Sequence, residues 1–246
     1  MACPRVANAE RRRSVKRFYK DVTIQQAGGG WQVTLDGRAL KSQGGRPQIV
    51  SSHALAKALA AEWDAQGEEI DPASFTFRDL TDYALDIVAP DPAAMAETLV
   101  KYAETDTLCY RAEPDDALFA QQEEEWEPLL ASVEKRENIR FTRVSGIMHQ
   151  AQPDATLETL RESLQSYDPI TLAALQTLAS LATSFCIGME ALQSGADPER
   201  LWRAANLEEL WQEELWGKDE EARERRSIRK AEFMNAFQWS QLARSG

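Results

Sequence analysis

The stretch Gly28-Gly29-Gly30-Trp31-Gln32-Val33-Thr34-Leu35-Asp36-Gly37-Arg38 decides the amino-terminal part of the fold. Its tryptophan, valine and leucine alternate with polar residues, which is typical of a strand with one buried face. Asp36-Gly37 then favours a two-residue hairpin turn, and a further strand is expected near residues 39–42. Around it, residues 15–50 gather β-branched and aromatic residues between glycine turns, as at Phe18-Tyr19. The sequence therefore predicts a small region of strands and hairpins.

The chain beyond residue 50 reads as almost wholly helical. Ser51 and Ser52 are both suitable N-caps for an Ala/Leu-rich helix over residues 54–66. Three Asp-Pro pairs mark further helix starts, because the carboxylate caps free N–H groups and proline loses nothing in the first turn. These pairs are Asp91-Pro92, Asp168-Pro169 and Asp197-Pro198; other helices are expected over 77–89, 115–137, 155–165 and 220–242, with a short strand possible at 139–144.

One long helix over residues 170–192 is expected at the centre of the core. Its apolar residues recur in alternating steps of three and four, which gives a single stripe along the helix. Polar residues interrupt the segment, so a membrane span is not favoured. The stripe consists of Leu175, Leu178, Ala182, Phe185, Met189 and Leu192.

These patterns predict an α+β protein in which a small amino-terminal β-rich domain precedes a larger all-α domain. Residues 1–14 are expected to be a basic, disordered end. Residues 15–74 are assigned to the β-rich domain with one helix, and residues 75–246 to the helical domain.

Composition narrows the classes of function. The chain has 246 residues, of which 43% are hydrophobic and 28% charged, as in a folded, water-soluble protein. Its net charge of -12 argues against nucleic acid or an anionic membrane as the main partner. The first twenty residues are basic but contain no apolar run, so a secretory signal is not expected, while a mitochondrial presequence stays open.

Candidate catalytic and metal-binding residues are scattered. Cys3, Cys109 and Cys186 form no CxxC pair, which favours a reducing compartment over disulfides or a thiolate zinc site. His53 and His149 belong to no metal-binding motif, so no metal or cofactor is predicted. An enzyme would need a site assembled from distant acids, for example Asp82, Asp86 and Asp106.

The segment from Leu201 to Leu215 carries the candidate partner-binding residues. Treated as one helix, it places Glu208 and Gln212 in the middle of an apolar side, where Trp216 also falls one turn later. Either the two polar residues form an internally hydrogen-bonded pair, or this face is a partly open groove that meets a partner. The remaining acids, Glu209, Glu213 and Glu214, fall at the margin of the apolar side or behind it.

The tryptophans are compatible both with a role in the core and with a role on a partner surface. Seven tryptophans are spread along the chain, and most are expected to be core anchors with a paired indole N–H. Some of them are expected on a partner surface, where tryptophan is enriched.

A set of short motifs resembles one known family, the assembly chaperones that hold the α subunit of the soluble catalytic head of F-type ATP synthase. No single motif is specific, but their order and spacing are. Two segments depart from the family pattern, Ser42-Gln43 after the hairpin and Ser74-Phe75-Thr76-Phe77 before the next helix. The motifs are Arg17-Phe18-Tyr19-Lys20, Leu35-Asp36-Gly37-Arg38 with Leu40-Lys41, Glu62-Trp63 with Gln66, Asp86, Glu104-Thr105-Asp106 with Tyr110, Gln122 with Trp126 and Pro128, and Glu208, Gln212 and Trp216-Gly217.

The resemblance implies a chaperone without catalysis, cofactor or small-molecule substrate. It implies binding of the unassembled α subunit and shielding of its β-facing surface until the hexamer forms. It also implies that the protein acts in the cytoplasm of a bacterium or in the mitochondrial matrix of a eukaryote. A generic helical scaffold is the other non-enzymatic alternative. The residues expected to bind the partner are Glu208, Gln212, Glu213, Trp216 and Gly217.

Overall fold

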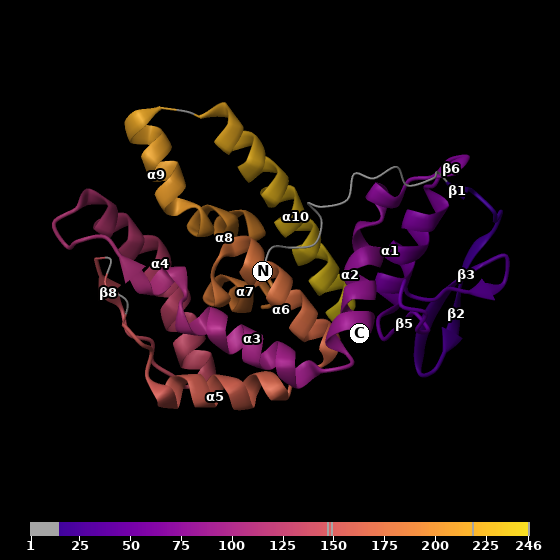
Figure 1. Ribbon diagram of the computed structural model, residues 1–246, viewed down its shortest axis with the longest axis horizontal. Helices are drawn as coiled ribbons and strands as arrows, with labels where there is room; N and C mark the ends of the chain where they lie inside the picture. The colour runs from indigo at the N-terminus through magenta and orange to yellow at the C-terminus, as the bar shows by residue number, and fades with distance from the viewer. Residues whose placement is uncertain (1–14, 147, 149, 218, 246) are drawn as a thin grey trace.

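A computed structural model describes residues 15–146, 148, 150–217 and 219–245. The basic end at 1–14 and His149, singled out above, lie outside the described residues. Figure 1 shows a small region of strands at one side of the molecule and a larger body of helices beside it. The predicted α+β class is confirmed.

The hairpin stretch forms the central strand of a four-stranded antiparallel sheet. Asp36 and Gly37 have positive φ values of 48° and 77°, the conformation that a two-residue hairpin turn requires. The strand near residues 39–42 is shorter than expected and is followed by a bridge between Lys41 and Pro47. The strands of this sheet are β2 (Val22–Ala27), β3 (Gly30–Leu35), β4 (Arg38–Ala39) and β5 (Ile49–Val50).

Phe18-Tyr19, counted above among the residues typical of strands, lies outside any strand. The chain instead pairs β1 (Val15–Lys16) with β6 (Glu69–Ile70), and Arg17 donates hydrogen bonds to the carbonyls of Asp64 and Gln66. Those carbonyls lie at the end of α1 (His53–Asp64), where they need donors from outside the helix. The Arg17 side chain therefore holds this segment in place. The pattern of apolar and polar residues in the sequence does not predict such a contact.

Helix α1 packs the sheet onto the helical body. Ser52 is its N-cap, as expected, and its hydroxyl accepts hydrogen bonds from the N–H groups of Ala54 and Leu55. The aromatic ring of Trp63 lies between those of Tyr19 and Phe75, with centroid distances of 5.7 and 4.5 Å. Together they form the core that joins the strands to the helices.

The helical body begins with α2 and ends with α10, which runs back to the strand region (Figure 1). The predicted caps Asp91, Asp168 and Asp197 each accept hydrogen bonds from the first turn of their helix, and proline follows each of them. Besides α1, the α-helices are α2 (Thr76–Tyr83), α3 (Pro92–Glu104), α4 (Ala117–Glu137), α5 (Asp154–Gln165), α6 (Pro169–Ala182), α7 (Phe185–Ala191), α8 (Pro198–Ala205), α9 (Leu207–Trp216) and α10 (Glu220–Arg244); Pro72–Ser74 and Thr107–Cys109 form 3-10 turns.

The single long helix expected over residues 170–192 is wrong. The chain breaks at Thr183, whose φ is +52°, and α7 restarts with Ser184 as N-cap. Asp106, which is fully buried, accepts hydrogen bonds from the Ser184 hydroxyl and the Cys186 N–H and so holds the break. The apolar stripe itself is correct, because all six of its residues are buried.

Two other segments differ from expectation. The strand expected at 139–144 is reduced to β8 (Val144–Ser145), which pairs in parallel with β7 (Tyr110–Arg111). The helix expected over 77–89 is α2 followed by a π-helical turn at Ala84–Val88. Within the described part of the chain, no helix is both long and apolar enough to cross a membrane.

Candidate functional site

The segment expected to bind a partner is two helices rather than one. α8 ends at Ala205 and α9 begins at Leu207, and Asn206 between them has φ -115° and ψ 20°. The Asn206 amide donates to the Trp202 carbonyl and closes α8. The single helical wheel that put Glu208 on the face of Leu201 is therefore wrong, because the helix axis changes direction between them.

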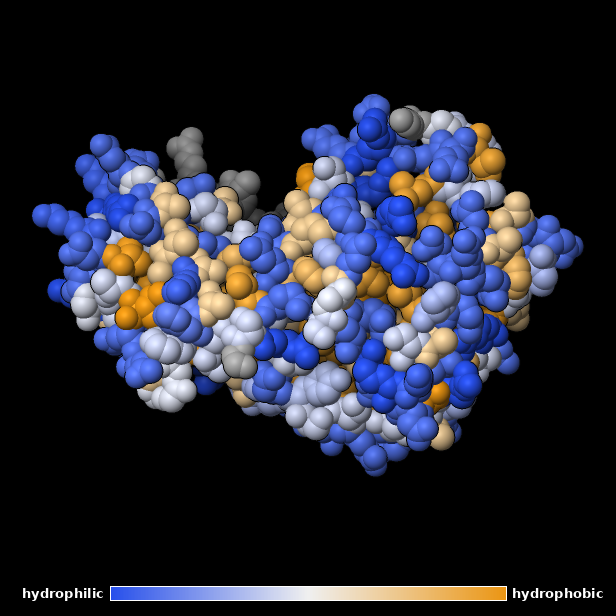
Figure 2. All heavy atoms as spheres, turned by 180° about the vertical axis from the view of Figure 1, so that it is seen from behind, coloured by the Kyte–Doolittle hydropathy of each residue, from blue (hydrophilic) through white to orange (hydrophobic). Residues whose placement is uncertain are grey.

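α9 projects from the body and contributes no buried residue. It forms a helical hairpin with the first turns of α10, which also bury nothing before Phe233. We call this hairpin, residues 207–217 and 219–232, the arm; it lies at the top of Figure 1. Figure 2 shows orange apolar side chains among blue ones at its upper right, where the arm lies.

Large apolar side chains are exposed on the arm. Trp216 is 79% exposed, and Leu215 and Ile228 are each 57% exposed. Gly217 ends α9 with a φ of +91°, and a Cβ added there would meet no atom within 4 Å. Solvent-exposed tryptophan beside aliphatic residues is typical of a protein-binding surface.

An arginine from α10 holds the two helices of the arm together. The Arg226 guanidinium lies 2.9 Å from the Glu209 carboxylate and 2.6 Å from that of Glu213. The Arg226 and Glu213 side chains are only 12% and 16% exposed, so Glu213 faces the inside of the hairpin. Of the predicted partner-binding residues, Glu213 is thus already engaged within the chain, and Arg226 is a residue that the sequence analysis missed.

Glu208 is tied to the body rather than to Gln212. Its carboxylate accepts a hydrogen bond of 2.8 Å from the side-chain amide of Gln122 on α4. Gln122 is fully buried. The side-chain amide oxygen (Oε1) of Gln122 in turn accepts from the Ala112 N–H at 2.7 Å. Burial of this carboxylate raises its pKa, and the hydrogen bond from Gln122 works in the opposite direction. The residue as a whole is exposed, so the crowding is confined to the end of its side chain.

Gln212 is exposed, and within the described residues no hydrogen bond joins its side chain to another group. The structure therefore gives no support to an internally bonded pair of Glu208 and Gln212. It brings Glu208 and Gln122 together instead. Both residues belong to the motifs quoted above, but nothing in the sequence pairs them.

The acids considered for an enzyme site do not form one cluster. Asp82 accepts hydrogen bonds from the Gln48 amide and the Gln43 N–H, and Asp86 accepts from Ser42 and Gly44. These bonds fasten the loop of residues 42–48 to α2 and its π-helical turn. Asp106 caps the buried start of α7 instead. Within the described chain no three His, Cys, Asp or Glu side chains could hold a metal ion.

The two described cysteines are buried, and burial followed by the nearby Asp106 charge raises the pKa of both thiols. A thiol with a raised pKa carries little thiolate, the form that acts as a nucleophile. Cys109 and Cys186 therefore belong to the core.

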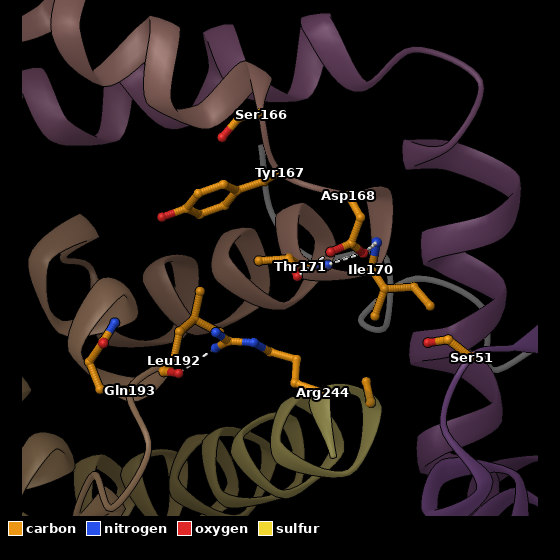
Figure 3. Close-up of a pocket in the computed structure, with 10 residues that line it drawn as sticks. Ser51, Ser166, Tyr167, Asp168, Ile170, Thr171, Leu192, Gln193 and Arg244 are labelled. Atoms are coloured by element: carbon orange, nitrogen blue, oxygen red, sulfur yellow. Dashed lines mark hydrogen bonds between the residues drawn. The ribbon is translucent and has the colours of Figure 1, made fainter. Parts of the chain in front are cut away.

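A cavity of about 490 Å³ opens where the ends of α5, α7 and α10 meet the start of α6 (Figure 3). The polar groups that line it form hydrogen bonds with the ends of the surrounding helices. Asp168 accepts from the N–H groups of Ile170 and Thr171, and the Arg244 guanidinium donates to the Leu192 carbonyl. The cavity thus offers no free catalytic group among these residues.

The fold and the arm can be compared with known proteins. The crystal structure of Atp12 from Paracoccus denitrificans superposes with a TM-score of 0.88 at 33% sequence identity, covering 93% of this chain and 98% of that one. The chain belongs to the ATP12 chaperone family. The family model described as ATP12 chaperone protein matches residues 16–134. The sequence resemblance to assembly chaperones of ATP synthase is thereby confirmed.

Two further relatives agree. Protein atp12, mitochondrial, of Schizosaccharomyces pombe is 27% identical over 223 residues, which cover 86% of this chain and 77% of the relative. The crystal structure of the Atu1473 protein of Agrobacterium tumefaciens is 37% identical with a TM-score of 0.85, covering 93% of this chain and 86% of that one. The similarity to ATP12 proteins thus extends across the strands, the helical body and the arm.

Proposed function

We propose that this ATP12 chaperone binds the unassembled α subunit of the catalytic head of ATP synthase and does so through the arm. One observation carries the proposal: α9 buries none of its residues and leaves the Trp216 side chain 79% exposed. Exposed tryptophan is unfavourable in water, and it is among the residues that most often dominate binding energy once a partner covers them. The choice of the α subunit rests on the family resemblance.

A holding chaperone needs apolar contact for affinity and polar groups that orient the client. The arm supplies Leu215 and Trp216 for the first role, and Glu208 and Gln212 for the second. Gly217 lets the chain turn directly after the tryptophan, while Glu213 fixes the shape of the hairpin through Arg226. Such a surface would cover the β-facing side of the α subunit and leave when the β subunit arrives.

A role without catalysis is part of the proposal. The acids that could have formed an active site hold loops and helix ends, and the thiols are buried. No nucleic acid, small-molecule substrate, cofactor or membrane insertion is needed for this role. We place it in the cytoplasm of a bacterium or the mitochondrial matrix of a eukaryote.

Coexpression with an aggregation-prone α subunit tests the proposal. We expect the α subunit to stay soluble with this chain and to aggregate without it, in the absence of ATP. A generic helical scaffold would rescue unrelated aggregation-prone proteins as well as, or better than, the α subunit. An α subunit that aggregates equally with and without the chain would contradict the proposal.

Single substitutions separate binding from folding. Glu208→Ala and Gln212→Ala should both weaken binding of the α subunit. Gln212→Ala should change the melting temperature little, because Gln212 is exposed. Glu208→Ala also leaves the buried Gln122 amide without its acceptor and should cost about 1 to 3 kcal/mol of stability, so binding is compared per folded molecule. Glu162→Ala on the exposed face of α5, outside the arm, is the matched control, and it should change neither property. A lower melting temperature with undiminished binding per folded molecule would show that Glu208 serves the fold alone.

A further inference from the structure

A groove of about 190 Å³ lies between α4 and the α8–α9 corner. Ala204, Leu207, Leu210 and Trp211 give it apolar walls, and the last three of these are only half-buried. The indole N–H of Trp126 donates to the Ala204 carbonyl at 2.8 Å, which anchors this corner to α4. The groove is therefore a formed feature with incompletely covered apolar side chains.

The charge around the groove is mostly negative. α9 contains four glutamates and no lysine or arginine. Arg226 engages two of them on the inner side of the hairpin, but Glu214 borders the groove and Glu125 of α4 faces it from the other side. No ion pair joins either carboxylate to another described residue. Arg203 is the one cation among the described residues that line the groove.

An apolar groove with acidic margins is complementary to an apolar side chain that has a cation nearby. Without a partner, a groove of this volume holds several water molecules. Their release from half-buried leucine and tryptophan favours an apolar occupant. A lysine or arginine on the same segment would meet Glu125 and Glu214, which are free to pair across the interface.

We propose that this groove binds one apolar side chain of the client, from a segment that carries lysine or arginine within about one helical turn. The proposal rests on the proposed function and specifies the segment of the α subunit that the chaperone recognises. Trp216 at the tip of α9 and this groove at its base would then hold the client at two points. The groove would select client segments by their sequence, whereas the exposed tryptophan alone would bind many apolar surfaces.

The test uses the full chain and purified α subunit in equilibrium binding. Leu210→Ala removes part of the apolar wall, and the double variant Glu125→Lys with Glu214→Lys reverses the charge of the margins. We expect each to raise the Kd for the α subunit about tenfold or more. In the double variant the margins repel the client's cation, so added salt should strengthen its binding where it weakens that of wild type. The double variant Glu68→Lys with Glu162→Lys, at exposed positions before β6 and on α5, is the charge-matched control and should stay within twofold of wild type.

Crosslinking identifies the bound segment directly. With a benzophenone amino acid in place of Leu207, the crosslinked peptide of the α subunit should contain an apolar residue next to lysine or arginine. A crosslink to an acidic or uncharged segment would overturn the inference.

The outcomes separate this inference from the proposed function. If Trp216→Ala weakens binding while the groove variants bind like wild type, the groove proposal fails and the arm proposal stands. If wild type does not bind the α subunit, both fail. Leu210 and Glu214 lie on α9, which has no buried residue, and Glu125 of α4 is only half-buried, so the variants should fold like wild type. A melting curve for each confirms that a loss of affinity is not a loss of folding.

Discussion

Replacing Trp63 tests how the strand region is held against the helices. A buried tryptophan removes about 150 to 250 Å² from water, which corresponds to about 4 to 6 kcal/mol at ~25 cal/mol per Å². Trp63 is 9% exposed and packs between Tyr19 and Phe75, so it gains nearly all of that area. Trp63→Ala should lower the free energy of unfolding by about 3 to 5 kcal/mol.

Trp63→Phe separates packing from the polar atom. Among the described residues, the indole N–H of Trp63 has no hydrogen-bond partner, and a buried unpaired donor costs about 1 to 3 kcal/mol. Phenylalanine loses some area but removes that donor. Trp63→Phe should therefore cost only about 1 kcal/mol, since the two effects partly cancel.

Urea unfolding followed by circular dichroism gives these free energies. Trp216→Ala is the matched control, because its side chain is 79% exposed and its loss should change stability by less than about 0.5 kcal/mol. The reasoning is refuted if Trp63→Ala stays within about 1 kcal/mol of wild type, or if Trp63→Phe costs as much as Trp63→Ala.

Two further predictions concern the helical body. Glu134 is 2% exposed and accepts hydrogen bonds from Arg143 and the Phe141 N–H. Glu134→Ala should cost about 1 to 3 kcal/mol in urea unfolding, because the buried Phe141 N–H loses its acceptor while Arg143 keeps its ion pair with Glu127. Burial alone would raise the pKa of Glu134, but these bonds outweigh it and lower the pKa, so the stabilisation is present above the unfolded pKa and is lost as the pH falls through the folded value. The difference between wild type and Glu134→Ala should accordingly narrow in acid, and a constant difference would contradict this. Ser184→Ala removes the N-cap of α7 and a donor to buried Asp106, and should cost about 1 to 3 kcal/mol; an unchanged melting temperature would show that the helix break needs neither bond.

Features set by neighbouring residues could be predicted from the sequence. The Asp36-Gly37 turn and the caps at Asp91, Asp168 and Asp197 each depend on contacts within about four residues of the chain. The buried stripe of residues 175–192 was also correct, because burial follows periodicity even where the helix is interrupted.

Features set by distant residues could not. The break at Thr183 is held by Asp106, which lies 78 positions before Ser184, and nothing in the local sequence forbids a continuous helix there. Glu208 finds its partner Gln122 at a separation of 86 positions. The change of direction at Asn206 likewise depends on packing of α8 against the body, so a single helical wheel misplaced the acids that follow it.

The affinity of the purified α subunit for wild type and for Trp216→Ala, measured by isothermal titration calorimetry, tests the central claim most directly. Trp216 has most of its surface in water, so its replacement leaves the fold unchanged and removes only what a partner could use. We expect wild type to bind one α subunit and Trp216→Ala to bind more weakly by about 2 kcal/mol or more, roughly thirtyfold in Kd. Equal affinity of the two proteins for the α subunit would contradict the arm as its binding surface.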